Sequence, residues 1–249
     1  MQNAIESALR KVQADASQFG AAGRTDTGVH ATSQVISFVT PHERPADAWR
    51  KGLNSHLPSS VRVHWVRPVS AEFHARFAAT SRRYLYVFQE GEFDPLSRNR
   101  VTPTGVLDDA AMHTAAQCLV GEHDFTALRA AACQSPTPFR RVDHVLVRRF
   151  GPFVVIDVAA NAFLLRMMRN IACALRRVGR GEWRTSDLQS ALEGRDRKVV
   201  GRTAPPDGLY LVDVQYPPHF LLDSQEQVSG WPPGRLPPML QHRHSLDRL

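Results

Sequence analysis

The chain has 249 residues, of which 43% are hydrophobic, and its formal net charge is +7 at pH 7. That composition allows a normal globular core and argues against a membrane protein, because no window approaches the roughly 18 consecutive apolar residues of a membrane span. The first residues lack the charged and apolar regions of a signal peptide, so we expect a cytoplasmic protein.

The three cysteines argue against a disulfide framework or a structural zinc site. Cys118, Cys133 and Cys173 are widely spaced and form no Cys-x-x-Cys arrangement. The eleven histidines form no His-Glu-x-x-His motif. We therefore predict no metal.

The positive charge comes mostly from arginine. Arginine presents a planar fork to phosphates and stacks on bases, so the excess favours RNA as a partner. Charge alone does not decide this, because many basic proteins bind no specific polyanion.

The first quarter of the chain alternates helical and extended patterns. Apolar residues recur at helical spacing in residues 2–16, and a second helical stretch covers 46–53. Residues 34–39 are rich in β-formers, and apolar and polar residues alternate over 61–65, which predicts a half-buried strand.

The middle of the chain predicts three strands and one helix. In residues 83–89 tyrosines and a phenylalanine share one face while Leu85 and Val87 share the other, so both faces should be covered. A helix is expected from Asp108 or Asp109 to Gly121. Residues 141–150 and 153–159 predict two strands joined across Gly151 and Pro152 as a hairpin.

The last third predicts a long helix over 162–178 with a basic polar face. Ser186 and Gln189 form a capping-box pattern for a short helix that ends at Gly194. Residues 209–215 predict a final strand. Interleaved strands and helices with a hairpin indicate an α+β fold, with an antiparallel sheet and helices on one side.

The most informative motif is Gly23-Arg24-Thr25-Asp26-Thr27-Gly28-Val29-His30-Ala31. It places one carboxylate, Asp26, between small, turn-forming residues. Gly23 and Gly28 allow close backbone approach and unusual dihedrals, and Arg24 is placed to hold the carboxylate through a charge-assisted pair. We therefore expect a reactive aspartate on a loop.

This motif closely resembles the signature of the TruA family of tRNA pseudouridine synthases. Four further blocks occur in the family's order: Phe73–Phe77, Arg82–Tyr86, Asn161–Ile171 and Gly208–Val212. Five ordered blocks are far more specific than one short pattern.

The resemblance implies a fold of two ferredoxin-like (RRM-like) halves that form one continuous, mainly antiparallel sheet with helices on one face and the active-site cleft between the halves. We place the halves at residues 1–88 and 108–216, with the connection at 89–107. The proline-punctuated segment 217–249 is expected to be a disordered tail.

The resemblance also implies the chemistry, which is isomerisation of uridine to pseudouridine without a cofactor. Asp26 corresponds to the catalytic nucleophile, Arg169 to the arginine that pairs with it, Arg24 to the residue that helps draw out the target nucleotide, and Tyr84 to the tyrosine that lies against the base. The implied substrate is the anticodon stem-loop of tRNA, at positions 38, 39 and 40 of the tRNA, and the implied assembly is a homodimer. Further candidates for RNA contact are Arg76, Arg82, Arg83 and Arg166.

The chain departs from the family pattern in two places. Family members begin with a strand that carries Tyr-Asp-Gly and Gly-Trp-Gln, and that pattern is not found ahead of the first helix. We expect its loss to leave backbone donors unpaired beside the active site. In the long helix, Met168 replaces a usual valine and Cys173 a common glycine.

Two other functions compete with this one. The first is an RNA-binding fragment of the same fold with impaired catalysis, since a ferredoxin-like sheet with basic and aromatic residues resembles an RRM. The second is an aspartic protease, because residues 26–28 spell Asp-Thr-Gly. Such proteases need two carboxylates that share a proton, and the chain has no second Asp-Thr-Gly.

Overall fold

The computed structural model describes residues 1–92 and 94–220, and the expected tail lies outside them except for residues 217–220. The described chain divides into two compact units. Unit 1 contains residues 1–24, 34–79 and 216–220, and unit 2 contains residues 25–33 and 80–215 without residue 93. The Asp26 loop therefore belongs to unit 2, although most of the chain around it belongs to unit 1.

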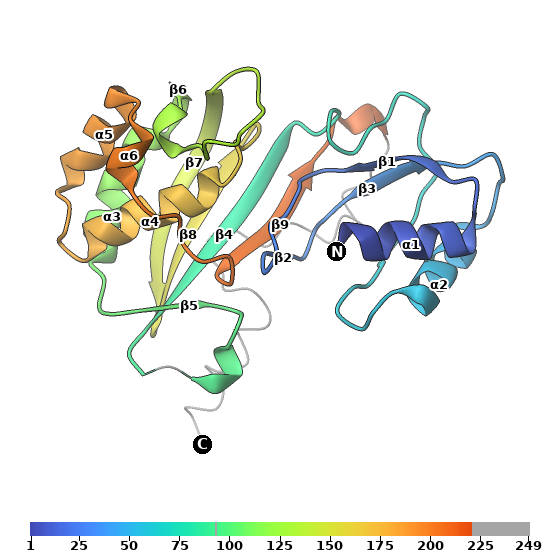
Figure 1. The fold of residues 1–249 in the computed structure, drawn as a ribbon, viewed down its shortest axis with the longest axis horizontal. Helices are drawn as coiled ribbons and strands as arrows, with labels where there is room; N and C mark the ends of the chain where they lie inside the picture. The colour runs from blue at the N-terminus through green and yellow to red at the C-terminus, as the bar shows by residue number, and fades with distance from the viewer. Residues whose placement is uncertain (93, 221–249) are drawn as a thin grey trace. The chain divides into compact units, whose positions relative to one another are not determined.

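Unit 1 packs two helices against a two-stranded antiparallel sheet (Figure 1). The helices are α1 (Gln2–Val12) and α2 (Ala46–His56), and the strands are β1 (Ser17–Ala21) and β3 (Ile36–Val39). The core between them contains Leu9, Trp49 and Leu53, with Phe38 packed edge-on against Trp49 at 5.0 Å between ring centroids. The apolar residues whose spacing predicted these two helices thus form the faces that the helices bury.

The strand predicted over residues 61–65 is wrong. The residues alternate between half-buried and exposed as expected, but they pair with no neighbouring strand. Instead the Asn54 side chain donates to the Val63 carbonyl and accepts from the Val63 N–H, both at 2.8 Å. One side chain thus satisfies the backbone groups that a ladder would otherwise have paired.

Unit 2 is built on a seven-stranded sheet with the order β2-β9-β4-β8-β7-β6, and β5 pairs with β4 off this path. The pairs β2–β9 and β4–β5 are parallel and the others are antiparallel. The described strands therefore lie in two sheets, one in each unit, rather than in one continuous sheet. The strand bounds are β2 (His30–Ala31), β4 (Ser81–Glu90), β5 (Thr102–Thr104), β6 (Gly121–Asp124), β7 (Phe139–Phe150), β8 (Phe153–Ala160) and β9 (Leu209–Gln215).

The α-helices of unit 2 gather on one face of the sheet, as the α+β expectation required (Figure 1). Helix α3 contacts β7, and α4 contacts both α3 and β4. The other face of β4 is also covered, because Leu85 and Val87 pack with Val101 and Val155. The helices are α3 (Asp109–Ala116), α4 (Met167–Gly179), α5 (Thr185–Gly194) and α6 (Arg197–Val200), and short 3-10 turns occur at Pro95–Ser97, Gln117–Leu119, Thr126–Leu128 and Pro218–Phe220.

The β7–β8 hairpin across Gly151 is confirmed, but two helix starts were wrongly predicted. Helix α4 begins at Met167 rather than at 162, because Arg166 adopts the left-handed conformation (φ 60°, ψ 10°). Helix α5 begins at Thr185, and Asp187 caps its first turn by accepting from the Arg184 N–H at 2.8 Å. The capping box predicted for Ser186 and Gln189 is therefore absent. In the part of the chain that is described, no helix is long and apolar enough to cross a membrane.

Candidate active site

The Asp26 loop closes on itself in a turn and leads into a strand of the unit 2 sheet. The Val29 N–H donates to the Asp26 carbonyl at 3.1 Å and closes a turn, and β2 then pairs with β9. Gly28 has φ +87°, and a Cβ at that position would lie 2.8 Å from Cγ of Pro206. Glycine is therefore required at position 28 both for its backbone conformation and for its contact with the segment before β9.

The carboxylate of Asp26 faces two guanidinium groups. Arg169 Nη1 donates to Asp26 Oδ2 at 2.6 Å, and Arg166 Nε lies 3.8 Å from the same oxygen. Both arginines come from the start of α4, where the helix dipole is positive. A charge-assisted hydrogen bond of this length orients the carboxylate firmly, while the Asp26 side chain stays 32% exposed and so open to a substrate.

Arg169 has a second bond that fixes its guanidinium. Its Nε donates to the Ala204 carbonyl at 2.7 Å, and its side chain is only 13% exposed. The planar group is therefore held at two of its nitrogens, which a lysine could not reproduce.

Tyr84 lies in β4 with its ring edge-on to Phe163, at 4.9 Å between centroids. It is buried, and burial raises the pKa of its phenol to about 12; the charge of Asp26 acts in the same direction and that of Arg82 against it. Tyr84 is thus a neutral phenol within electrostatic range of the carboxylate.

Two of the remaining predicted residues, Arg24 and Arg76, belong to unit 1. Arg24 is exposed in unit 1 and forms no ion pair within the described residues. Arg76 is also exposed in unit 1, with its guanidinium 5.7 Å from the Phe77 ring centroid. The partners that hold Asp26 therefore come from α4, and not from the neighbouring Arg24 as the motif alone had indicated.

Arg82 and Arg83 are buried, and their contact with RNA, which burial does not favour, stays a prediction. Arg83 donates to both carboxylate oxygens of Asp157, at 2.8 and 2.6 Å, and Arg82 donates to the Asn161 carbonyl at 2.9 Å. The structure gives these two arginines a role in the interior of unit 2. The sequence pattern of β4 could have shown that Arg83 is buried, since both faces of residues 83–89 were expected to be covered.

Sequence reasoning missed the segment that supports the pair. Ala204 accepts from Arg169, and Pro206 packs against Gly28, yet neither residue belongs to a recognised block. The only local signal is the turn-forming run from Pro205 to Gly208 that precedes the last strand.

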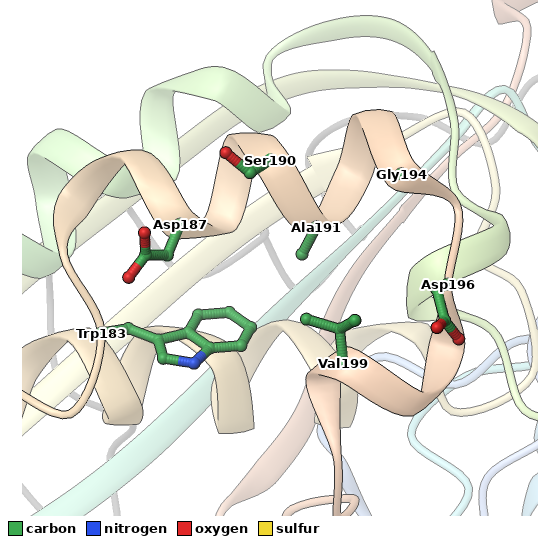
Figure 2. Close-up of a pocket in the computed structure, with 7 residues that line it drawn as sticks. All are labelled: Trp183, Asp187, Ser190, Ala191, Gly194, Asp196 and Val199. Atoms are coloured by element: carbon green, nitrogen blue, oxygen red, sulfur yellow. The ribbon is translucent and has the colours of Figure 1, made fainter.

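A pocket of about 350 Å³ on the helical side of unit 2 shares no residue with this site (Figure 2). In Figure 2 the indole of Trp183 and the side chains of Ala191 and Val199 line its middle, and Asp187 and Asp196 lie at its ends. Both carboxylates accept from backbone N–H groups at helix starts, and their charge would repel phosphates. Among the residues described, no group of three or more His, Cys, Asp or Glu could hold a metal ion.

The fold and the Asp26 site define an α+β protein with one aspartate held by arginines from a helix. A single carboxylate bound to arginine cannot share a proton with a second carboxylate, as an aspartic protease requires. It can instead attack, or stabilise charge at, an electrophilic carbon.

Comparison with known proteins gives the family. A family described as tRNA pseudouridine synthase matches residues 1–78 and 115–217. The tRNA pseudouridine synthase A of Photobacterium profundum is 47% identical over 230 residues, which cover 90% of this chain and 87% of that protein. Those of Shewanella frigidimarina (46% over 224 residues, 89% and 86%) and Aeromonas hydrophila (44% over 243 residues, 95% and 89%) are similar to a comparable degree. The chain belongs to the tRNA pseudouridine synthase family.

Proposed function

We propose that this protein isomerises uridine to pseudouridine in tRNA and that Asp26 is its catalytic residue. The observation that carries the proposal is the Asp26–Arg169 ion pair, at 2.6 Å between Oδ2 and Nη1. It joins the central residue of the family-like motif to a helix 143 positions away in the sequence. The family membership supports the substrate and the reaction.

The reaction needs no external reactant. The bond from uracil N1 to ribose C1′ breaks, the base turns, and C5 bonds to C1′; C5 loses a proton and N1 gains one, so the atoms balance. Asp26 serves this by attacking C1′ to form a glycosyl ester, or by assisting a glycal route. Arg169 holds the carboxylate in place, and Tyr84 presents a neutral aromatic side chain beside it.

Access to the base requires the nucleotide to leave its stack, at a cost of a few kcal/mol. We assign Arg24, which is exposed in unit 1, to drawing the nucleotide out. Arg166 and Arg76 are exposed and are assigned to the sugar-phosphate backbone. The resemblance supports the anticodon stem-loop as the target. It also supports a homodimer as the assembly, and sedimentation velocity would measure that oligomeric state.

The test is release of tritium from tRNA that carries label at uridine C5. The full chain should release label, and Asp26→Ala should release none while it still binds tRNA. The matched control is Asp143→Ala, which removes an exposed carboxylate paired with Arg141 and should act like the unchanged protein. Full release by Asp26→Ala would refute the role of Asp26. Binding of tRNA by the unchanged chain without any release would make it an RNA-binding module instead.

Arg169→Lys extends the test to the partner of Asp26. Lysine keeps the charge but cannot bond both Asp26 and Ala204. Loss of a hydrogen bond to a charged group costs roughly 1.5–3 kcal/mol, so release should slow by about ten- to a hundredfold. Arg148→Lys, an exposed change in β7, is the control and should leave the rate unaltered. Equal rates of tritium release by Arg169→Lys and Arg148→Lys would mean that the reaction does not need a guanidinium bonded to both Asp26 and Ala204.

A further inference from the structure

The segment from Thr203 to Pro206, here called the strap, touches Arg169 and the loop that carries Asp26. The Ala204 carbonyl accepts from Arg169 Nε at 2.7 Å, and the Ala204 N–H donates to the Arg169 carbonyl at 3.3 Å. Pro206 packs so closely on Gly28 that no side chain fits there. Any displacement of the strap would therefore move Arg169 and the Asp26 loop.

The strap has little backbone bonding of its own. Pro205 and Pro206 have no N–H group, so they cannot donate to a neighbouring strand. Its first residue is held by side chains, since Thr203 Oγ1 donates to Asn170 Oδ1 at 2.8 Å and Arg197 Nη2 donates to both oxygens. The Leu209 N–H donates to the Pro206 carbonyl at 2.9 Å, so the Pro205 carbonyl is the one left for a side chain to fix.

Tyr86 supplies that bond from the sheet. Its hydroxyl donates to the Pro205 carbonyl at 2.8 Å and lies 2.7 Å from Thr102 Oγ1. A phenol has a single proton, so Thr102 must be the donor to Tyr86. The ring is fully buried in β4, and burial raises the pKa of Tyr86, so the hydroxyl keeps its proton.

We propose that Tyr86 is a positioning residue of the isomerisation, whose hydroxyl holds the strap so that the Ala204 carbonyl fixes Arg169 against Asp26. The inference rests on the proposed function, and it gives a role to a side chain that the sequence alone marks only as core. Tyr86 touches neither Asp26 nor Arg169 through a hydrogen bond, so it acts through the strap.

The chain offers a matched control for Tyr86→Phe. Tyr210 is equally buried, and its hydroxyl also donates to a backbone carbonyl, that of Arg100, which is not part of the strap. Tyr210→Phe therefore deletes the same atom and the same kind of bond. The two variants should lose similar stability, as thermal melting would record.

The kcat and KM of tritium release separate the two roles. Tyr86→Phe should lower kcat about tenfold with KM for tRNA unchanged, because a small misplacement of a catalytic group slows the reaction steeply. Tyr210→Phe should keep kcat within about twofold and KM unchanged.

A second variant guards against loss of folding. Thr102→Val removes the donor to Tyr86 while the phenol can still reach Pro205, so it should lower kcat by less. Equal kcat for the Tyr86 and Tyr210 variants would overturn the inference while the unchanged chain still releases label. No release by the unchanged chain would overturn the proposed function, and this inference with it.

Discussion

At the residue scale, the buried ion pair of Asp157 and Arg83, which the half-buried His144 joins, has the strictest requirement for its partners. Asp157 is 2% exposed and lies within hydrogen-bond distance of both partners. Burial alone would raise the pKa of its carboxyl, but the bonds from Arg83 and His144 outweigh that effect and hold the pKa below the ordinary value of 3.8. The cluster therefore requires the ionised form.

This cluster predicts a pH-dependent stability. A carboxyl whose pKa is lowered by folding stabilises the protein above its unfolded pKa, and that contribution is lost as the pH falls through 3.8 and below. Asp157→Asn should cost about 3–5 kcal/mol of unfolding free energy at neutral pH, because Arg83 stays buried without its counter-charge. The variant should also lose less further stability on acidification than the unchanged protein.

Urea unfolding measured near neutral pH and again in acid would test both statements. Asp143→Asn is the control, because that carboxylate forms only an exposed ion pair with Arg141, worth about 1 kcal/mol or less. The interpretation would be wrong if the Asp157 variant showed the same acid sensitivity as the unchanged chain.

At the scale of elements, the Asp26 loop depends on a contact between two turns. Gly28 combines a positive φ of +87° with a clash distance of 2.8 Å to Pro206, so Gly28→Ala meets both strain and overlap. Gly91 has a similar φ of +77°, but a Cβ there would meet nothing within 4 Å. Gly91→Ala thus isolates the strain, which costs roughly 1–2 kcal/mol.

We expect Gly28→Ala to lose far more activity than Gly91→Ala at a temperature where both variants remain folded. The added methyl group must displace either Pro206 or the loop, and both positions control the Asp26–Arg169 geometry. Tritium release together with thermal melting of both variants would measure this. Similar activity in the two variants would mean that the turn contact does not position the site.

The elements also show what the sequence could predict. Strands β4, β7, β8 and β9 were located because each buries several alternating or continuous apolar side chains. Strands β1, β2, β5 and β6 were not predicted, because they have only two to five residues and exist through partners distant in the sequence. The segment 61–65 had the right alternation, but a side chain took the place of a neighbouring strand.

The same limit applies to the site. Local chemistry indicated a reactive Asp26, yet no local pattern could join it to Arg169, and that pairing came from resemblance alone. Arg83 was assigned to RNA contact because it lies in a recognised block, and no local pattern indicated its bond to Asp157, 74 positions away. The halves placed at 1–88 and 108–216 stay a prediction, and the compact units instead interleave along the chain.

At the scale of the whole molecule, the excess of 31 basic over 24 acidic residues should govern tRNA binding. Neutralising phosphates releases counterions, so the logarithm of affinity should fall linearly with the logarithm of salt concentration, by roughly 0.7–0.9 per phosphate contact. Arg24→Gln and Arg76→Gln should each lower that slope by about one. Arg83→Gln is not a valid comparison, because it would break the buried pair.

Filter binding over a series of salt concentrations would measure the slopes, with Arg148→Gln as the control for loss of an exposed charge. Affinity that does not change with salt would contradict a phosphate-based interface. Asp26→Ala should keep the full slope, since it removes no positive charge.

The interleaving of the two units along the chain determines what a cut polypeptide could do. Residues 25–33 bring Asp26 into unit 2, while Arg169 reaches that unit from residues beyond 80. A polypeptide severed between residues 79 and 80 would carry the carboxylate on one fragment and its guanidinium on the other. Neither fragment could then turn over substrate by itself, and recovered turnover after mixing would report that the two had reassembled.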